Sequence, residues 1–519
     1  MKRLLVGAAL LAGACSSVPA PPAGTDADTV AWWSITGDLS SDAMEGRDTG
    51  SAGYDRAADY VEQRFRAAGL TPAGESGGYR QTLMLKEVRV EKEGTSFEIV
   101  TSLHGVSPDG GVRMTEARAK REFLHDITVR PSAALPEMIQ APLAFRGYCS
   151  AGEMGEVKGK VVICFGARRA GMTTGGQRLE AAAKAGAVGI INVDDPGFTI
   201  EPSRWPEAYA RSITFRDAGP PAYPELVVMR LSAGALGAML GERSADILKA
   251  GASSQPLPSF DIPARINATF AISQRELQSD NVLAMLPGTD PVLKDEVVLV
   301  SAHLDGYGYG EPVNGDALYN GAFDDAAYVA SLIRLAESRS GEGFKRSVLF
   351  AVYTGEEKGL LGSTYYASHL TVPMEKIAAV INLDQLRPLF PLKALTMHGI
   401  TDTTLAGNVR RVASGMGIEV RPDLEPERNL NQRTDHFPFL RMGVPATNFV
   451  FAFDPGSESE VKYREWYQSR YHRPQDDMGQ PLDWDAARDM NLFFYRLTED
   501  VANDPVRPSF VAGSQWAPK

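Results

Sequence analysis

Residues 296–305 read EVVLVSAHLD, a run of apolar and β-branched residues that ends in a histidine and an aspartate. Similar runs follow at residues 347–354 and 376–383, and a helical pattern over residues 326–337 lies between the first two. Strands that are apolar along their whole length and alternate with helices are typical of a sheet covered on both faces. We therefore predict an α/β fold, a doubly wound mixed sheet with helices on both faces.

Each predicted strand is followed by residues that can bind metal or exchange protons. In such sheets functional side chains gather beyond the carboxyl ends of the strands. Carboxylates crowded into one cleft repel one another and lose hydration, and divalent cations would remove that cost. Imidazole and carboxylate ligands without thiolate form a normal zinc site. The residues concerned are His303, Asp305, Asp324, Glu356, Glu357, Asp384 and, far along the chain, His472.

The composition narrows the class of protein. The chain has 519 residues, of which 44% are hydrophobic and 23% charged, as in an ordinary globular protein. Lys and Arg number 53 against 65 Asp and Glu, and the resulting net charge of −12 argues against a nucleic-acid partner. Three cysteines exclude a disulfide scaffold or a Cys-rich zinc module. Any metal must therefore be held mostly by His, Asp and Glu.

The N-terminus indicates export. Three residues with two basic side chains precede an apolar run over residues 4–14, which is too short to span a bilayer and predicts a signal peptide over residues 1–15. The segment LAGAC, residues 11–15, resembles a bacterial lipobox, so we expect Cys15 to carry a lipid. Residues 16–30 would be a linker. We expect a lipid-anchored protein that faces the periplasm or the exterior; a plain secretory signal is the alternative.

The order of the candidate residues resembles that of the zinc-dependent exopeptidases of peptidase family M28, which use two zinc ions together. The resemblance runs from about Trp32 to Asp500 and includes LSSDAMEGR at residues 39–47. It implies the zinc exopeptidase fold and an aminopeptidase that acts on peptide or protein N-termini. Where the family often has a smaller residue, this chain has Phe323 and Tyr328, which we expect to narrow the floor beside the metals.

The resemblance assigns the ligands of two zinc ions per chain. His303 and His472 would each bind one ion, and Asp324 would bridge the two. Glu357 would complete the shell of one ion and Asp384 that of the other.

The resemblance also assigns three catalytic roles. Glu356 would act as the general base, because neighbouring residues point in different directions and only one of the Glu pair need reach metal. The Asp305 carboxylate would accept a hydrogen bond from the other ring nitrogen of His303. Tyr471 would donate its hydroxyl to the oxyanion of the tetrahedral intermediate.

The middle of the chain has a different pattern. A strand at residues 161–165, an Ala-rich helix at 177–185 and a strand at 186–192 resemble the protease-associated domain, a small β-rich insert of several exopeptidases. We therefore divide the chain into a first part of the peptidase domain at 31–130, the insert at 131–258 and the catalytic domain at 259–510. Cys149 and Cys164 are either paired or two buried free thiols.

Three further hypotheses accompany that of an aminopeptidase. A carboxypeptidase on the same scaffold would need arginines that hold a terminal carboxylate, a glutaminyl cyclase would use one zinc, and a non-catalytic surface binding protein should have lost ligands. His436 is expected to shape the pocket wall. The arginines between residues 204 and 216 are expected to be solvated surface, with a substrate-carboxylate site as the lesser alternative.

Overall fold

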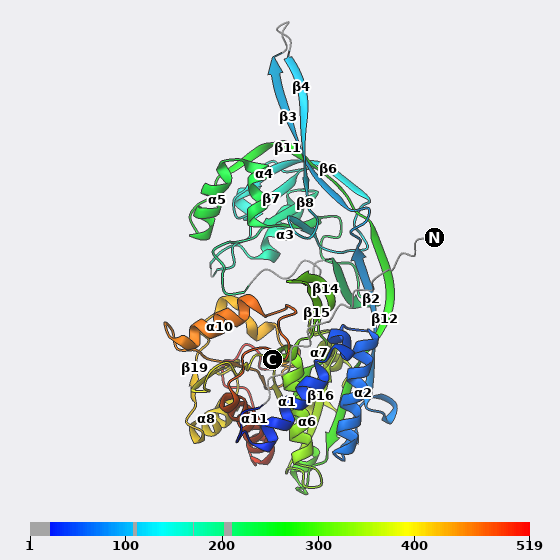
Figure 1. Cartoon of the computed structure of the whole chain (residues 1–519), viewed down its shortest axis with the longest axis vertical. Coiled ribbons are helices and arrows are strands. Elements are labelled where there is room, and N and C mark those ends of the chain that lie inside the picture. Colours follow the sequence, from blue (N-terminus) through cyan, green and yellow to red (C-terminus); the bar gives the residue numbers. More distant parts are fainter. Residues whose placement is uncertain (1–20, 107–111, 170, 202–209, 519) are drawn as a thin grey trace, which may run out of the picture.

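The structure, a computed structural model, describes residues 21–106, 112–169, 171–201 and 210–518. Figure 1 shows a helix-rich lobe below a smaller, strand-rich lobe, with a two-stranded hairpin projecting from the far end. The predicted signal peptide, Cys15 and the first residues of the predicted linker lie outside the described residues. None of the described helices combines the length and the apolar character needed to cross a membrane.

The larger lobe is built on an eight-stranded mixed sheet. The strand order is β20-β17-β13-β16-β12-β2-β9, with β1 also paired to β12. The pairs among β20, β17, β13 and β16 are parallel, and the pairs of β12 and β2 are antiparallel. The three predicted strands and the mixed sheet are confirmed. The strands are β1 (Thr71–Pro72), β2 (Arg80–Val90), β9 (Arg211–Phe215), β12 (Ile272–Leu286), β13 (Val297–His303), β16 (Ser347–Tyr353), β17 (Ile377–Asn382) and β20 (Ala446–Thr447).

Alternate side chains of β13 enter different cores, because successive residues of a strand point to opposite faces. Val298 and Val300 pack with one group of helices, while Val297 and Leu299 face another. The prediction of helices on both faces is therefore confirmed, and the predicted helix at 326–337 is α6. The first group is α1 (Ala27–Leu39), α2 (Ala52–Ala67), α6 (Ala327–Ser338), α8 (Leu405–Gly415) and α11 (Trp484–Asn503), and the second is α7 (Leu361–Ser368) and α9 (Phe437–Arg441).

Shorter elements complete the larger lobe. A hairpin and a three-stranded sheet lie apart from the main sheet, and α10 follows them in the chain. The elements are β14 (Gly308–Val313), β15 (Asp316–Tyr319), β18 (Ala394–Met397), β19 (Glu419–Arg421), β21 (Phe449–Phe451) and α10 (Glu458–Ser469).

A second eight-stranded sheet forms the smaller lobe, which we call the insert lobe (residues 91–271). Its order is β4-β3-β11-β6-β7-β8-β10-β5. The predicted strand, helix and strand are β7, α3 and β8, and the two strands are parallel neighbours. The strands are β3 (Ser96–Val106), β4 (Val112–Arg121), β5 (Ile127–Val129), β6 (Met138–Arg146), β7 (Val161–Phe165), β8 (Gly189–Val193), β10 (Val227–Leu231) and β11 (Ser259–Thr269), and the helices are α3 (Gly175–Lys184), α4 (Gly237–Leu240) and α5 (Arg243–Ala252).

The two lobes share strands. The chain enters the insert lobe after β2 and returns from it as β12, and these two strands pair from Arg80 with Val282 to Val90 with Ile272. The second sheet takes β3, β4 and β5 from before residue 131 and β11 from after residue 258, so the insert extends beyond the predicted bounds on both sides. In the opposite direction, β9 leaves the insert lobe and pairs with β2 in the first sheet. The insert lobe therefore contributes a strand to the sheet that carries the predicted site.

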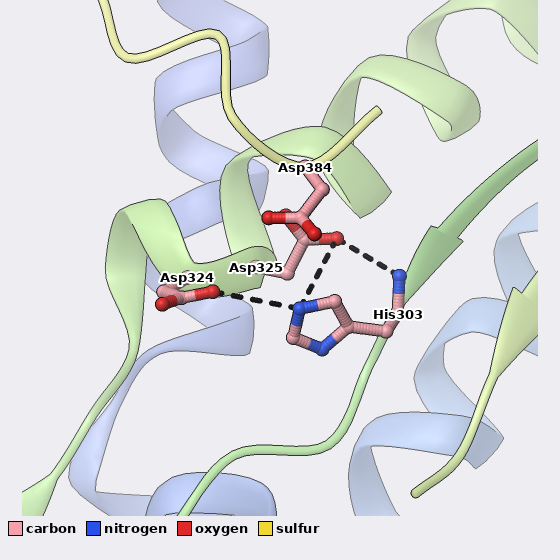
Figure 2. Close-up of side chains that lie close together, drawn as sticks. All are labelled: His303, Asp324, Asp325 and Asp384. Carbon is pink, nitrogen blue, oxygen red and sulfur yellow. Dashed lines mark hydrogen bonds and ion pairs between the residues drawn. The ribbon is translucent and has the colours of Figure 1, made fainter. Parts of the chain in front are cut away.

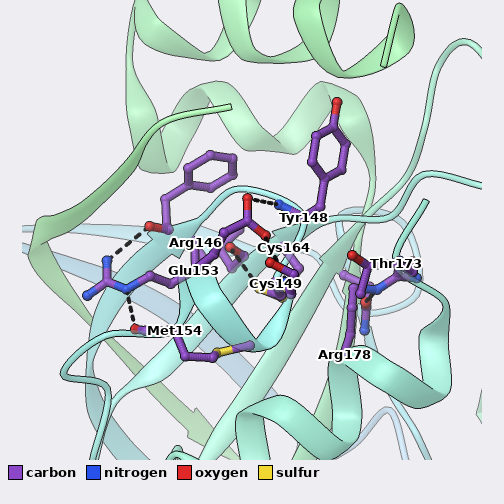
Figure 3. Close-up of a disulfide and its surroundings, with 12 residues drawn as sticks. Arg146, Tyr148, Cys149, Glu153, Met154, Cys164, Thr173 and Arg178 are labelled. Atoms are coloured by element: carbon purple, nitrogen blue, oxygen red, sulfur yellow. Dashed lines mark hydrogen bonds between the residues drawn. A yellow bond between two sulfur atoms is a disulfide. The ribbon is translucent and has the colours of Figure 1, made fainter. Parts of the chain in front are cut away.

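Cys149 and Cys164 form a disulfide and are not two free thiols (Figure 3). Cys164 lies on β7, and Cys149 lies in the segment that follows β6. Both are buried in an apolar cluster with Val157 and Ile190. The bond therefore fastens the β6–β7 connection to the core of the insert lobe.

We expect the double variant Cys149→Ala/Cys164→Ala to unfold with a free energy about 3 kcal/mol lower than the wild type, because the bond closes a loop with a sequence separation of 15 residues. Urea unfolding followed by circular dichroism, with and without reductant, measures the change. Reductant should shift the wild-type midpoint and leave the midpoint of the double variant in place. Equal midpoints for the two proteins would contradict a stabilising bond.

Candidate metal centre and active-site cavity

A cavity of about 400 Å³ lies at the carboxyl ends of the parallel strands. The residues predicted for the site that line it are Asp324, Glu356, Glu357, Asp384, Tyr471 and His472. His303 is 1% exposed and lies beneath them. The predicted residues therefore come together from segments that are widely separated in the sequence.

The strand ends position these side chains. His303 is the last residue of β13, and Asp384 follows the end of β17 by two residues. After β16 the chain turns at Gly355, whose φ is +67° and whose hydrogen leaves room for Leu361. That turn presents Glu356 and Glu357 at the same sheet edge.

Two groups of potential ligand atoms meet at Asp324. The first holds His303, Asp324, Asp325 and Asp384, and the second holds Asp324, Glu357 and His472; within each group the atoms lie within 4.8 Å of one another. His303 Nε2 is 3.5 Å from Asp324 Oδ1 (Figure 2), and His472 Nε2 is 3.3 Å from Asp324 Oδ2. The two oxygens of Asp324 thus face different histidines, as a bridging ligand requires.

The hydrogen bond at the other nitrogen of His303 differs from the prediction. Nδ1 lies 3.0 Å from the backbone carbonyl oxygen of Asp305 and 3.7 Å from its carboxylate. The carboxylate instead accepts hydrogen bonds from the Glu356 backbone N–H and the Thr49 hydroxyl. A carbonyl oxygen only accepts, so Nδ1 carries the proton and Nε2 is free to bind metal. The tautomer is the predicted one, but it is fixed by the backbone of Asp305.

Tyr307 contacts two members of the second group and was not predicted from the sequence. Its hydroxyl donates to Glu357 Oε2 over 2.7 Å and lies 3.2 Å from His472 Nδ1. One hydroxyl therefore orients two predicted ligands. Its proximity to Glu357 depends on the β13–β14 loop and has no local sequence signal.

Asp325 was also missed as a site residue, because an Asp pair before a helix is commonly an N-cap. Its Oδ2 accepts the backbone N–H of His303 over 2.8 Å. Asp476 supports the same loop, since its carboxylate accepts the backbone N–H groups of Phe323 and Asp324. The adjacent Asp pair was the one available signal for Asp325.

Arg387 brings a buried cation to Asp324. Its Nη2 lies 3.4 Å from Asp324 Oδ2, and the side chain is 2% exposed. The guanidinium carbon lies 4.2 Å from the centre of the Trp466 ring and 5.2 Å from that of Tyr467. Arg387 therefore offsets part of the negative charge around the shared carboxylate.

Burial has a large influence on the pKa values of this cluster. It raises the pKa of Asp384 to about 6 and the pKa of Glu356 and Asp325 well above the usual range of a carboxyl. Burial acts in the same direction on Asp324, but His303 and His472 beside its two oxygens hold its pKa well below that range. The protein's own cations and hydrogen-bond donors therefore offset only part of the negative charge of these carboxylates.

Unpaired oxygens show where further positive charge fits. Asp324 Oδ2, Asp325 Oδ1 and Glu357 Oε1 are buried and lack a well-aligned hydrogen bond from a described residue, although His472 Nε2 lies 3.3 Å from the first and 3.2 Å from the third. Buried polar atoms are normally satisfied, and leaving them unpaired is costly. Divalent cations would satisfy them, and a set of imidazole nitrogens and carboxylate oxygens suits zinc. The residues present therefore fit zinc ions.

Glu356 and Tyr471 border the ligands without joining either group. The Glu356 side chain is 11% exposed, and its Oε2 lies 3.9 Å from His303 Nε2. The Tyr471 ring stacks on the His472 ring, with centres 3.7 Å apart. Both residues line the cavity.

His436 lies outside both ligand groups. Its Nδ1 is 2.7 Å from the Thr434 hydroxyl, and its Nε2 is 3.0 Å from Asn431 Oδ1, so both nitrogens are engaged by neighbours. Arg211 departs from the expectation of solvated surface, because it lines the cavity as the first residue of β9. Because β9 pairs with β2, Arg211 lies at the cavity although its neighbours in the sequence belong to the insert lobe.

One segment of the chain matches a known protein family. Residues 281–498, which include all five predicted ligands, match the model of peptidase family M28. Leupeptin-inactivating enzyme 1 of Streptomyces exfoliatus is 25% identical over 236 residues, which cover 44% of this chain and 50% of that protein. The chain thus spans about half the length of this relative.

Two solved structures resemble the whole chain. An aminopeptidase from Aneurinibacillus sp. strain AM-1 has a TM-score of 0.60 at 16% identity and covers 93% of this chain and 95% of its own. BSAP, a zinc aminopeptidase from Bacillus subtilis, has a TM-score of 0.57 at 16% identity, with 92% and 95% coverage. At this identity the likeness establishes the fold, which agrees with the predicted α/β architecture. Together with the family match, it supports an enzyme of the zinc peptidase class.

Proposed function

We propose that this chain is a zinc-dependent aminopeptidase, built on the peptidase family M28 domain over residues 281–498. The observation that carries the proposal is the pair of ligand groups that share Asp324 beneath a cavity that also contains Glu356. The likeness to solved aminopeptidase structures supports it.

The two groups suggest two zinc ions per chain. His303 and Asp384 would hold one ion, His472 and Glu357 the other, and Asp324 both. Zinc bound in this way polarises a carbonyl group and lowers the pKa of water towards neutrality. Support comes from the two oxygens of Asp324, which face different histidines at 3.5 and 3.3 Å.

Glu356 is the proposed general base and acid. Its carboxylate would accept a proton from the attacking water and return it to the nitrogen of the leaving peptide. The Asp305 carboxylate holds the backbone N–H of Glu356 over 2.9 Å, which fixes the start of this residue beside the cavity. Asp305 is thus a positioning residue for the base.

Tyr471 is the proposed donor to the oxyanion. Its ring lies against His472, and its hydroxyl oxygen is 3.4 Å from Arg433 Nη2. An oxygen that accepts from a guanidinium keeps its own proton for a second acceptor, here the carbonyl oxygen of the substrate.

The charges around the cavity favour an aminopeptidase over a carboxypeptidase. Three cations line it, but the chain's own carboxylates bind them: Asp48 binds Arg211 at 2.6 Å and Lys358 at 3.3 Å, and Glu201 binds Arg433 at 3.0 Å. Their charge is therefore largely offset and does not favour a terminal carboxylate of a substrate. The acidic floor suits the α-amine of a peptide N-terminus instead.

A glutaminyl cyclase and a non-catalytic binding protein fit the site less well than an aminopeptidase. A glutaminyl cyclase needs one zinc, whereas this chain keeps two groups of ligands. A non-catalytic binding protein should have lost ligands or the base, and this chain retains both groups and Glu356.

We also propose that the protein is exported, with Cys15 lipid-anchored to a bacterial membrane. The Cys149–Cys164 disulfide supports an oxidising compartment. We also assign a protease-associated domain to the insert lobe, whose sheet extends beyond the predicted bounds of 131–258, and the order β7, α3, β8 supports this assignment.

The proposed function is tested with amino-acid p-nitroanilides that have a free or an acetylated α-amine. We expect release of p-nitroaniline from the free amines only, its loss after dialysis against a chelator and its return when zinc is added. Activity on acetylated substrates and none on free amines would contradict an aminopeptidase. Full activity in the metal-depleted protein would contradict a role for zinc.

A further inference from the structure

Glu201 of the insert lobe is buried against the larger lobe. Its side chain is 5% exposed and contacts Arg428 and Arg433 of the larger lobe. Oε1 accepts a hydrogen bond from Arg428 Nε over 2.9 Å, and both carboxylate oxygens lie within 3.1 Å of Arg433 Nη1. One carboxylate therefore joins two cations across the boundary between the lobes.

This carboxylate stays charged. Burial alone would raise the pKa of Glu201, but Arg428 and Arg433 lower it to about 2. Arg428 is fixed independently of Glu201, because its Nη1 also pairs with Glu425 at 3.1 Å and its guanidinium lies over the Tyr467 ring. Arg433 is 31% exposed and pairs with the carboxylate of Glu201, while its Nη1 also donates to the backbone carbonyl of Arg428 over a longer 3.3 Å. Arg433 is thus the arginine whose position depends more on Glu201.

Arg433 connects this ion pair to the cavity. Its Nη1 binds Glu201, while its Nη2 lies 3.4 Å from the Tyr471 hydroxyl. Tyr471 in turn stacks on His472, and Arg433, Tyr471 and His472 all line the cavity. A continuous series of contacts therefore runs from the insert lobe to the hydroxyl proposed as oxyanion donor.

We propose that Glu201 is a positioning residue through which the insert lobe orients Tyr471, with Arg433 as the intermediate. The inference rests on the proposed aminopeptidase function. With its carboxylate in place, Arg433 donates to the Tyr471 oxygen and leaves the phenol proton directed at the substrate. Without it, Arg433 turns towards solvent, and Tyr471 loses the contact that orients its hydroxyl. The insert lobe is then a working part of the hydrolytic site.

The test compares Glu201→Gln in the wild-type and Tyr471→Phe backgrounds, using the full chain and a p-nitroanilide substrate. In the wild-type background we expect kcat to fall about tenfold and KM to stay within about twofold of its original value. The loss in kcat is smaller than that from removing an oxyanion donor, because Tyr471 is still present but less well oriented. In the Tyr471→Phe background the same change should lower kcat less than about twofold, because residues that act through one another are non-additive. Glu201→Asp should restore part of kcat.

The matched control is Glu116→Gln, which removes a carboxylate of the insert lobe that likewise binds two arginines, Arg118 and Arg265, none of which lines the cavity. We expect its kcat to equal that of the wild type, and zinc content to be unchanged in every variant. An unchanged kcat in Glu201→Gln, or an equal loss in both backgrounds, would overturn the inference. An inactive wild type would instead overturn the proposed function, so the two failures are distinguishable.

Discussion

We expect Glu356→Gln to lower kcat about 10³-fold while the protein keeps its full zinc content. General acid–base catalysis by one side chain contributes about 10² to 10⁴ in rate. Glutamine keeps the volume and the polarity of the side chain but has no basic oxygen. Glu356 belongs to neither ligand group, so the metal sites should remain intact.

Kinetics on a p-nitroanilide and zinc analysis by mass spectrometry measure the two quantities on one sample. The neighbouring Glu357→Gln is the matched comparison, since the same change at a proposed ligand should lower zinc content as well. If Glu356→Gln loses both zinc ions, the division of roles within the Glu pair is wrong. If it keeps wild-type kcat, Glu356 is not the base.

We expect Asp324→Asn to lose both zinc ions and at least about 10³-fold in kcat. Asp324 is the one residue shared by the two ligand groups, and its two oxygens face different histidines. An amide nitrogen replaces one of these oxygens and donates where a ligand must accept. Loss of metal removes several kcal/mol of transition-state stabilisation, and about 1.4 kcal/mol corresponds to a factor of ten.

The comparison for this prediction is Asp384→Asn, which alters the first group only. It should bind one equivalent of zinc, whereas Asp324→Asn should bind none at the same free concentration. Isothermal titration of the metal-depleted proteins with zinc gives both stoichiometries. Two equivalents in Asp324→Asn, or none in Asp384→Asn, would contradict a bridging role for Asp324.

Local patterns were sufficient for three strands of the main sheet and for grouping the residues that follow them, while the ligand roles came from the family resemblance. The apolar runs identified β13, β16 and β17, and the residues after them had to meet at one sheet edge. His303 and Asp384 could therefore be placed together although nothing near either residue points to the other. The tautomer of His303 could be predicted from general chemistry. That the backbone carbonyl of Asp305 fixes it could not be predicted.

Long-range contacts could not be predicted in this way. The role of Arg387 depends on its contacts with Trp466 and Asp324, which are far from it in the sequence. The role of Tyr307 depends in the same way on its contact with Glu357. Arg211 looked like a surface residue, because a strand that leaves one lobe to pair in another has no local pattern. The extent of the second sheet was hidden for the same reason, since β11 pairs with both β3 and β6.

The pairing of β2 with β12 also constrains the order in which the chain folds. Thr82 of β2 bonds to Asp280 of β12 across 198 residues of sequence, and the whole insert lobe lies between them. During synthesis from the N-terminus, β2 therefore has no β12 to pair with until the insert lobe has been made. A folded insert lobe brings its two ends together and so removes most of the loop-closure entropy that this pairing would otherwise cost. We therefore expect the insert lobe to fold first and the sheet beneath the cavity to close afterwards.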